Sequence, residues 1–531
     1  MRSITKCGTS IVLCLGLAAC GGDSARTSAA SSAAASAGAA PSSSTGARVP
    51  TAAPAWTRGA ACYEVFVRSF YDSNGDGIGD LNGLIQKLDY INDGDPASKS
   101  DLGASCMWLM PIAESPSYHG YDVSNYYRVE PAYGTNDDFK RLVAEAHRRG
   151  IKVIVDMVLN HTSSQYPAFQ EALRDTASPY RQWYRFSPNP LGNDPAVQEE
   201  AMKEATFWLR DMGADGLRLD AIQYLVEQGT CQMDCAGTHA FLRRYQAHVD
   251  SVEPGAYTIG EVWDSLGELL TYYPDQLTAY FTFDLADSLR TAVKRGSPGG
   301  MLEQYLRLQD TLPSYRWSPL LSNHDGTRIM TVLGGDMARA RLAATLLLTL
   351  PGLPYVYYGE EIGMTGDKPD PRLRTPMQWA PEPGVGFTSA TPWEVPQPDS
   401  MTTNVTVEDT VAGSLLNLYR RLFHLRKENE ALATGHLTQL TASSPDVVAY
   451  LRRAGDDAVL VVANLGDAVS GVAIHSTGHV LPAGAYAAHD LLGGPNRALL
   501  QVAEDGRISG YVPAPGTLAA REALVLELTH Q

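Results

Sequence analysis

The sequence predicts a (β/α)8 TIM barrel with a short insertion, followed by a small antiparallel β domain. Two observations favour this fold class. From about residue 61, short β-rich segments alternate with amphipathic helical segments, and near residue 430 the alternation gives way to strands and turns without helices. An open doubly wound sheet is the alternative, but the chain lacks the glycine-rich phosphate loop typical of that fold. We therefore expect a closed barrel of parallel strands.

Eight segments qualify as barrel strands. They are, in chain order, CYEVFVRSF, SCMWLMPI, GIKVIVDMVLN, GLRLDAI, AYTIGEVW, YFTFDLA, SPLLSNHD and LPYVYYGEE. Amphipathic stretches such as DDFKRLVAEAHRRG (137–150) separate them, and a last helix is expected around Leu415 to Lys427. Strands such as VVAYLRR, AVLVVANL and ALVLELTH follow that helix. The expected domains are a barrel at 55–430 and a C-terminal β-sandwich at 431–531.

The first 54 residues predict export and a lipid anchor. Arg2 and Lys6 precede an apolar run, 11–19, that is too short to span a bilayer and is typical of a signal peptide. The LAAC sequence that ends this segment (1–20) resembles the bacterial lipobox, whose cysteine, here Cys20, is lipidated. The Ser/Ala/Gly/Pro tract at 21–54 is typical of a tether. We expect anchoring to the bacterial cell envelope, facing the periplasm or the exterior.

The charge of the chain excludes several partners. The formal net charge is -17 and the pI is near 5.1, and no basic stretch offsets the acidic excess. Nucleic acid and an anionic membrane surface are therefore not expected to bind, so the lipid is the only expected membrane contact. We expect a monomer that binds a neutral or cationic ligand.

Four cysteines remain once the leader is removed and Cys20 is lipidated. Cys231 and Cys235 are close enough in sequence to close a small loop, and Cys62 and Cys106 begin two predicted strands. Export permits disulfides. Zinc is the alternative for Cys231 and Cys235, but no second pair stands at ligand spacing. A structural role is favoured, and the sequence leaves the pairing open.

The segment DSNGDGIGD, residues 72–80, is rich in oxygen ligands. Gly77 stands where an EF-hand loop turns sharply, but Gly83 replaces the bidentate Glu of that motif, so the loop is not an EF-hand. A structural cation is expected, and an acidic, glycine-rich surface turn is the alternative. The candidate ligands are the side chains of Asp72, Asn74, Asp76 and Asp80 and the carbonyl of Ile78.

Ionisable residues end several of the predicted strands. Asp156, Asp220, Glu261 and Asp325 each follow an apolar run. Enzymes built on this barrel place their chemistry at the carboxyl ends of the strands. A lone Asp at such a position is more often a helix cap or turn residue, but capping alone does not explain four placements in strand order. The sequence therefore predicts a cluster of carboxylates at one end of the barrel.

Several motifs resemble the signature regions of the α-amylase family, glycoside hydrolase family 13, near its oligo-1,6-glucosidase and neopullulanase branch. The four main ones are DMVLNH (156–161), GLRLDA (216–221), GEVW (260–263) and SNHD (322–325). YHGYD (118–122), RTPMQW (374–379) and GLPYVYYGEE (352–361) add support. The resemblance implies that residues 72–80 form the structural Ca²⁺ loop known from bacterial members.

The resemblance also implies catalytic roles. Asp220 matches the nucleophile, Glu261 the acid/base, and Asp325 the carboxylate that stabilises the distorted sugar. Cleavage with retention needs a carboxylate nucleophile and a proton-donating carboxylic acid about 5 Å apart. With Asp220 and Asp325 ionised, the proton is expected to stay longest on Glu261.

Further residues match substrate contacts of the family. Arg218 lies on the same strand face as Asp220, where its cation can keep the nucleophile ionised, and Trp263 is expected to add an apolar wall. Single histidines and tyrosines are more often packing residues, but these lie inside matching motifs. The expected substrate-binding residues are Arg218, His119, Tyr121, Asp122, His161 and His324.

The expected reaction is hydrolysis of α-1,4-glucosidic bonds in maltooligosaccharides. In the resembling branch, Val after the nucleophile accompanies α-1,6 cleavage, whereas this chain has Ala221. The insertion after the third strand, at about 160–197, is short: only YRFSPNPLGNDPAV (184–197) stands where relatives carry a longer domain B. The alternatives are an α-glucosidase or oligo-1,6-glucosidase, a trehalose-synthase-like transglycosylase, and an inactive glucan-binding lipoprotein.

Overall fold

The computed structural model describes residues 53–184, 186 and 195–531. The expected signal peptide, its Cys20 and nearly all of the tether lie outside the described residues, as do residues 187–194 of the short insertion. Among the described residues, no helix has the length and apolar character needed to cross a bilayer.

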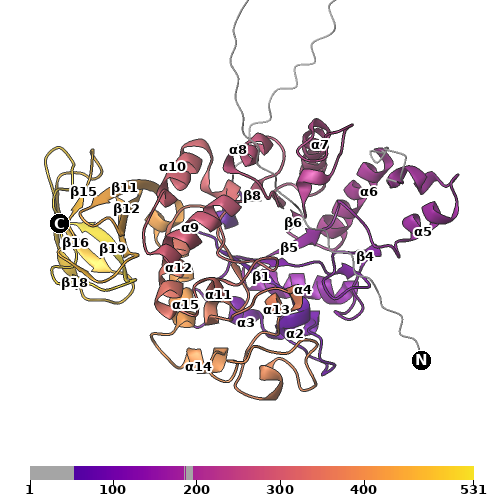
Figure 1. Cartoon of the computed structure of the whole chain (residues 1–531), viewed down its shortest axis with the longest axis horizontal. Coiled ribbons are helices and arrows are strands. Elements are labelled where there is room, and N and C mark those ends of the chain that lie inside the picture. Colours follow the sequence, from indigo (N-terminus) through magenta and orange to yellow (C-terminus); the bar gives the residue numbers. More distant parts are fainter. Residues whose placement is uncertain (1–52, 185, 187–194) are drawn as a thin grey trace, which may run out of the picture. The chain divides into compact units, whose positions relative to one another are not determined.

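Eight parallel strands form one sheet (Figure 1) in the order β10-β1-β2-β5-β6-β7-β8-β9. The ends of the sheet meet, because the amide of Tyr355 donates to the carbonyl of Pro319 at 3.0 Å and that of Leu353 to Trp317 at 2.9 Å. The predicted (β/α)8 barrel is therefore confirmed. The strands are β1 (Cys62–Val65), β2 (Cys106–Leu109), β5 (Lys152–Met157), β6 (Gly216–Leu219), β7 (Tyr257–Gly260), β8 (Ala279–Phe281), β9 (Trp317–Ser318) and β10 (Tyr355–Tyr357).

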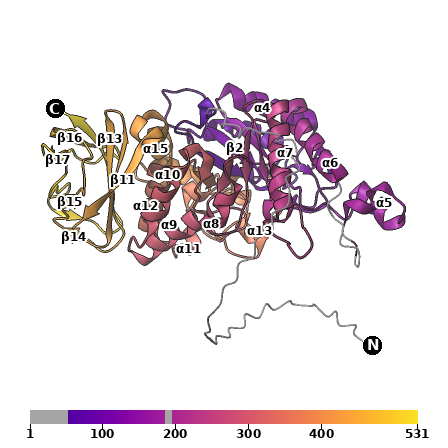
Figure 2. The ribbon, with the colours of Figure 1, turned by 90° about the horizontal axis from the view of Figure 1, so that it is seen from above.

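The barrel strands are buried along nearly their whole length, as expected for parallel strands covered by helices on one side and filled by side chains on the other. The helices surround them (Figure 2). They are α1 (Val67–Phe70), α2 (Leu81–Gln86), α3 (Leu88–Ile91), α4 (Asn136–Arg148), α5 (Pro167–Arg174), α6 (Pro195–Thr206), α7 (Ala236–Val252), α8 (Leu266–Leu269), α9 (Phe283–Arg295), α10 (Met301–Thr311), α11 (Ile329–Val332), α12 (Met337–Thr349), α13 (Asp370–Leu373), α14 (Val405–Asp409), α15 (Leu415–Glu428) and α16 (Glu430–Thr434).

Helix α4 illustrates how the sequence sets a barrel helix. Thr135 and Asp138 form a capping box, which satisfies amides of the first turn. Phe139, Leu142 and Ala146 recur at helical spacing and are fully buried, while the opposite face is charged. The apolar face of α4 therefore packs in the same core as the side chains of β5.

The insertion after β5 contains helical structure in its described part. Helix α5 and the 3-10 turn η2 (Pro179–Trp183) precede α6, which leads to β6. After β2, the short strands β3 (Ala113–Glu114) and β4 (Asn125–Val129) pair antiparallel.

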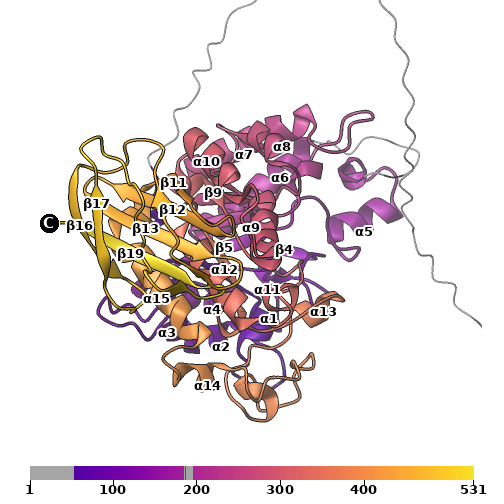
Figure 3. The same ribbon diagram turned by 60° about the vertical axis from the view of Figure 1, so that its left-hand side comes forward.

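The C-terminal residues form the predicted antiparallel domain (Figure 3). In β13, Val459, Val461 and Ala463 belong to the core of the barrel helices, whereas Leu460 and Val462 belong to a separate core. This alternation is the period of two that a strand imposes on its faces. The strands are β11 (His436–Ala442), β12 (Val447–Ala454), β13 (Asp457–Asn464), β14 (Val469–Ser470), β15 (Ile474–His475), β16 (Gly484–Asp490), β17 (Arg497–Val502), β18 (Thr517–Leu518) and β19 (Ala523–His530).

Two buried arginines join the end of α12 to its neighbours. Arg426 of α15 donates to the carbonyls of Leu348 and Leu350 at 2.9 and 2.8 Å. Arg452 of β12 donates to the carbonyl of Thr349 at 2.6 Å and to that of Leu432 at 3.0 Å. These carbonyls end a helix and have no partner within it, so the guanidinium groups satisfy them.

The structure pairs the four described cysteines. Cys62 and Cys106 are register partners at the starts of β1 and β2 and form one disulfide. Cys231 and Cys235 form the other, which closes a small loop before α7. Both bonds have the structural role that the sequence favoured.

Candidate active site

The predicted carboxylates meet at the carboxyl end of the barrel. Asp156 is opposite Arg218 in the register of β5 and β6, and Asp220 and Glu261 directly follow β6 and β7. Asp325 lies in the loop after β9. Because parallel strands end at one face of a barrel, segments far apart in the sequence contribute to one site.

Arg218 holds three of these carboxylates. Its Nη1 lies 2.8 Å from Oδ1 of Asp156 and 2.8 Å from Oδ1 of Asp220, and its Nη2 lies 2.7 Å from Oε2 of Glu261. The guanidinium is 1% exposed and lies over the ring of Trp108. A planar fork of donors can orient several carboxylates at once. Arg218 therefore brings Asp220 and Glu261 together.

Two further groups donate hydrogen bonds to Glu261. Its Oε2 accepts the amide of Ala221 at 2.9 Å, and its Oε1 accepts the indole Nε1 of Trp263 at 2.6 Å. Trp263 stacks on Phe283 with ring centroids 3.7 Å apart and is 50% exposed. The residue expected to be an apolar wall thus also fixes the orientation of Glu261.

Burial raises the pKa of two carboxyls of this group, Asp156 and Asp220. Burial, together with the charges of Glu261 and Asp156 and a hydrogen bond to Glu261, raises the pKa of Asp220 to about 7, although Arg218 opposes the shift. The sequence analysis placed the retained proton on Glu261. Asp220 instead carries the raised pKa, so Asp220 retains a proton into the neutral range.

The pKa of Asp325 shifts in the opposite direction from that of Asp220. Its Oδ2 is 3.1 Å from Nε2 of His324, and its Oδ1 accepts from Arg374 at 2.9 Å. Burial opposes ionisation, but these two cations hold the pKa of Asp325 well below its usual range. The side chain is 37% exposed, so an ionised carboxylate faces the open side of the site.

His324 is buried between two carboxylates. Its Nδ1 lies 2.6 Å from Oε1 of Glu64, which is itself buried at the end of β1. Burial alone would lower the pKa of His324, but the charges of Asp325 and Glu64 raise it to about 10. His324 is therefore an imidazolium at neutral pH.

Two other predicted substrate residues join this group. Tyr121 donates to Asp156 at 3.0 Å and its hydroxyl lies 2.6 Å from Nε2 of His324, with the two rings stacked at 5.4 Å. His119 stacks on Tyr121 at 6.2 Å, and burial lowers its pKa, so its ring is neutral. Its Nδ1 accepts the amide of Tyr121 at 3.1 Å, which leaves Nε2 as the donor.

Ser117 links Asp122 to His119, because its hydroxyl lies 3.2 Å from Nδ1 of His119 and also donates to Asp122, whereas His161 lies at a cavity. One carboxylate oxygen of Asp122 accepts the hydroxyls of Ser115 and Ser117, which orders the loop before it. His161 is exposed and lines a cavity of about 100 Å³ together with Tyr126 and Glu204.

Sequence reasoning missed several residues of the site, namely Glu64, Trp108, Asp156 as an Arg218 partner, and Arg374. Glu64 carries a usable signal, because a single charge inside the apolar run CYEV is costly unless it is paired. Arg374 begins the RTPMQW motif, which indicated the family but did not predict a role for this arginine.

In the loop at residues 72–80, backbone amides hydrogen-bond to a carboxylate of the same loop. Asp72 is buried, and it accepts the amides of Asn74, Gly75 and Gly77 at 3.0, 2.7 and 2.8 Å. Gly77 has φ 91, and a Cβ there would lie 2.2 Å from the carbonyl oxygen of Thr391. Only glycine fits this turn.

The donor set of the loop suits Ca²⁺, since it offers only carboxylate, amide and carbonyl oxygens. Asp80 also caps α2 by accepting the amide of Gly83, whereas Asp76 is exposed. In the part of the chain that the structure describes, no three Asp, Glu, His or Cys side chains meet at metal-binding distance. Oδ1 of Asn74, both carboxylate oxygens of Asp76 and Oδ2 of Asp80 each accept one hydrogen bond and keep a lone pair for an ion. The two oxygens of Asp72 already accept four hydrogen bonds, from Asn74, Gly75, Gly77 and Thr388.

Comparison with known proteins agrees with the site. The family model of the α-amylase catalytic domain matches residues 64–196 and 191–435. Alpha-amylase 3 of Dictyoglomus thermophilum is 35% identical over 444 residues, covering 77% of this chain and 85% of that protein. A trehalose synthase/amylase of Mycolicibacterium smegmatis is also 35% identical, covering 77% and 84%.

A solved structure gives the same result. The crystal structure of the α-amylase from H. orenii superposes with a TM-score of 0.77 and 36% identity, covering 89% of this chain and all of that one. The fold, the order of the strand-end residues and these likenesses lead to one conclusion: the chain belongs to the α-amylase family, glycoside hydrolase family 13.

Proposed function

We propose that the protein is a retaining glycoside hydrolase that cleaves α-1,4-glucosidic bonds in maltooligosaccharides derived from starch. One observation carries the proposal: Arg218 holds Asp220 and Glu261 side by side, and a third carboxylate, Asp325, faces the same site. A pair of close carboxyls is what retention requires.

The two carboxyls divide the reaction between them. Glu261 gives its proton to the glycosidic oxygen while Asp220 attacks the anomeric carbon, so the bond to the leaving sugar breaks as the bond to Asp220 forms. Glu261 then takes a proton from water, and that water displaces Asp220. The raised pKa of Asp220 keeps a proton on Asp220, so transfer of that proton to Glu261 when substrate binds would give both residues the required forms.

The two neighbouring cations determine the role of Asp325 in the reaction. His324 and Arg374 keep it ionised, so it accepts hydrogen bonds from sugar hydroxyls and offsets positive charge at the reacting carbon. Tyr121 stacks on His324 and its hydroxyl lies 2.6 Å from Nε2 of His324, which holds the imidazolium beside Asp325. These residues recognise the donor sugar and stabilise its distorted form.

The α-1,4 preference rests on Ala221 and on the relatives. Ala221 has the left-handed φ of 43°, a conformation that β-branched residues disfavour. Valine at this position accompanies α-1,6 cleavage in the branch that the sequence resembles. Two relatives whose names include α-amylase, from D. thermophilum and H. orenii, agree with this preference.

A trehalose-synthase-like transglycosylase is the second candidate. It is favoured by the equal identity, 35%, to the trehalose synthase/amylase of M. smegmatis. An exported enzyme suits hydrolysis of external glucans better, and the intact carboxylate group counts against an inactive glucan-binding protein.

Three further features belong to the proposal. Residues Asp72, Asn74, Asp76, Ile78 and Asp80 would hold a structural Ca²⁺, which neutralises the acidic loop. Cys20 would carry the lipid that anchors the protein to the cell envelope. The enzyme would act as a monomer.

Product analysis tests the function. The purified protein and its Asp220→Asn variant are incubated with starch, maltoheptaose, isomaltose and maltose. Release of shorter maltooligosaccharides by the wild type alone supports the proposal. Trehalose formed from maltose would support the transglycosylase, and binding without turnover by both proteins would overturn the enzyme assignment.

A further inference from the structure

Hydrogen bonds join the loops that follow β6 and β7. The amide of Ala221 donates to Oε2 of Glu261 at 2.9 Å, and the amide of Ile222 donates to the carbonyl of Glu261 at 3.2 Å. Another bond runs in the opposite direction, because the amide of Trp263 donates to Oε1 of Gln223 at 2.8 Å. The first two bonds fix Glu261 itself, whereas the last fixes the residue whose indole binds Glu261.

Gln223 lies in the protein interior. It is 1% exposed, and its Nε2 has no hydrogen-bond partner among the described residues. A buried amide nitrogen without a partner lowers stability, and an apolar side chain of the same length would avoid that loss. An apolar side chain could not accept the Trp263 amide, however. The unpartnered nitrogen therefore favours a role for the side-chain oxygen of Gln223.

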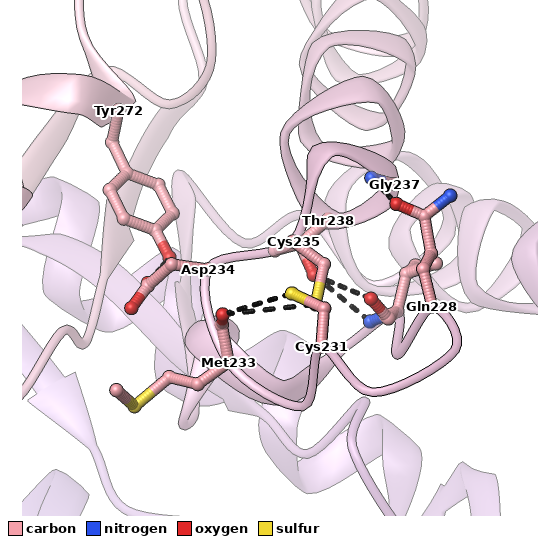
Figure 4. The surroundings of a disulfide bond; sticks show 9 residues. Gln228, Cys231, Met233, Asp234, Cys235, Gly237, Thr238 and Tyr272 are labelled. Atoms are coloured by element: carbon pink, nitrogen blue, oxygen red, sulfur yellow. Dashed lines mark hydrogen bonds between the residues drawn. A yellow bond between two sulfur atoms is a disulfide. The ribbon is translucent and has the colours of Figure 1, made fainter.

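A loop closed by a disulfide holds the backbone of Gln223. The carbonyl of Gln223 accepts the amide of Asp234 at 2.9 Å, and Asp234 has a left-handed φ of 54°. Figure 4 shows Asp234 in the loop that the Cys231–Cys235 disulfide closes, with the hydroxyl of Tyr272 directed at the Asp234 carboxylate. Because disulfide geometry is specific, the bond restricts the backbone between the two cysteines. It therefore helps to keep the Asp234 amide against Gln223.

Trp263 connects Gln223 to the acid/base. Its indole Nε1 donates to Oε1 of Glu261 at 2.6 Å, and its ring stacks on Phe283. Trp263 is 50% exposed, so packing covers only part of the ring and the direction of Nε1 depends on the backbone that carries it. Gln223 binds that backbone directly. A displacement of about 1 Å in a catalytic group can lower a rate about a hundredfold.

We propose that Gln223 is a positioning residue for Glu261. It holds the backbone of Trp263 so that the indole keeps the Glu261 carboxyl in the orientation for proton donation, and the loop closed by the disulfide holds Gln223. The inference rests on the proposed hydrolase function, in which Glu261 protonates the departing oxygen. Gln223 thus acts through Trp263 and not on the substrate.

Two substrates separate proton donation from a general loss of structure. Cleavage of maltoheptaose requires a proton on the departing oxygen, whereas fluoride leaves α-maltotriosyl fluoride with little help from an acid. Gln223→Met keeps the length of the side chain and removes the acceptor. It is expected to lower kcat/KM for maltoheptaose about thirtyfold, with KM changed less than about twofold, and to lower kcat/KM for the fluoride less than about threefold.

Three further variants make the test specific. Gln223→Glu keeps an oxygen that can accept the Trp263 amide and should restore kcat/KM for maltoheptaose to within about fivefold of wild type. In a Trp263→Phe background, which lacks the indole donor, Gln223→Met should lower the rate by less than about a further twofold, because both changes break one connection. Gln309→Met is the matched control and should change neither substrate, since Gln309 accepts the amide of Leu437 at 2.6 Å between α10 and β11.

Equal falls for both substrates in Gln223→Met, or unchanged rates for both, would overturn the inference and leave the hydrolase assignment intact. A Gln223→Glu variant as slow as Gln223→Met would also overturn it. If Gln223→Met does not fold, Cys231→Ser/Cys235→Ser provides the test. A fall of about threefold or more for maltoheptaose alone supports the inference, and equal changes for both substrates overturn it. A wild type that does not cleave maltoheptaose would refute the proposed function and the inference with it.

Discussion

Oε1 of Glu64 lies 2.6 Å from Nδ1 of His324, and both side chains are buried. The two residues come from β1 and from the loop after β9, at opposite ends of the barrel sequence. The ion pair directs the other ring nitrogen of His324 toward Tyr121 and Asp325. Glu64 is therefore a positioning residue for the group that keeps Asp325 ionised.

Glu64→Gln should destabilise the fold by removing the ion pair between Glu64 and His324. The raised pKa of His324 gives stability that is complete below pH 6.5 and lost as pH rises through about 10. Loss of the Glu64 charge should cost about 2 kcal/mol of unfolding free energy at pH 6. The difference from wild type should shrink toward pH 10. Denaturant unfolding at several pH values measures it, and a difference that is constant with pH would contradict the ion pair.

Arg218→Lys should lower kcat without abolishing binding. Lysine keeps the charge but cannot hold Asp156, Asp220 and Glu261 with one planar group. We expect a fall in kcat of about a hundredfold or more, with KM for maltoheptaose changed much less. Steady-state kinetics measure both. Lys368→Arg, at an exposed ion pair, is the control for exchanging the two cations, and equal losses in both variants would refute the role.

Glu360→Gln should raise stability in alkali. Burial raises the pKa of Glu360 from 4.5 to about 8, against the hydroxyls of Ser322 and Tyr419. A raised carboxyl pKa gives stability that is present below pH 4.5 and lost as pH rises to about 8. The variant should match wild type within about 1 kcal/mol near pH 4.5 and exceed it at pH 9. Thermal unfolding across this range gives the comparison, and lower stability at pH 9 would contradict it.

Calcium should stabilise the wild type through the loop at 72–80. At saturating Ca²⁺ we expect the Tm to rise by about 2 °C or more relative to EDTA. Asp76→Ala should remove this rise without lowering the Tm in EDTA, because Asp76 is exposed. Asp72→Ala should lower the Tm in both conditions, since Asp72 also holds the turn. An unchanged wild-type Tm would refute the site.

Much of the fold could be predicted because buried strands give continuous apolar runs. The run SPLLSNHD predicted a longer strand than β9, which ends at Ser318. Pro319 follows, and its missing amide cannot extend a strand ladder. Local pattern therefore finds a strand but does not fix its end.

The candidate site was predictable where strand order alone brings residues together. Asp220, Glu261 and Asp325 follow barrel strands and meet. The partners of Asp325 were not predictable, because the contacts with Arg374 and, through His324, with Glu64 join distant segments. The partners of Asp122 were not predictable either, because Ser115 and Ser117 precede the motif that contains Asp122.

The arginine contacts at the end of α12 bear on how this enzyme could be divided. Arg452 belongs to the C-terminal sheet, yet it satisfies the carbonyl of Thr349 in a barrel helix. A chain cut after residue 430 would leave that carbonyl unsatisfied and would uncover the apolar surface of α12 on which β13 packs. The C-terminal sheet is thus not a removable accessory, and a fusion partner or shortened variant has to keep both parts.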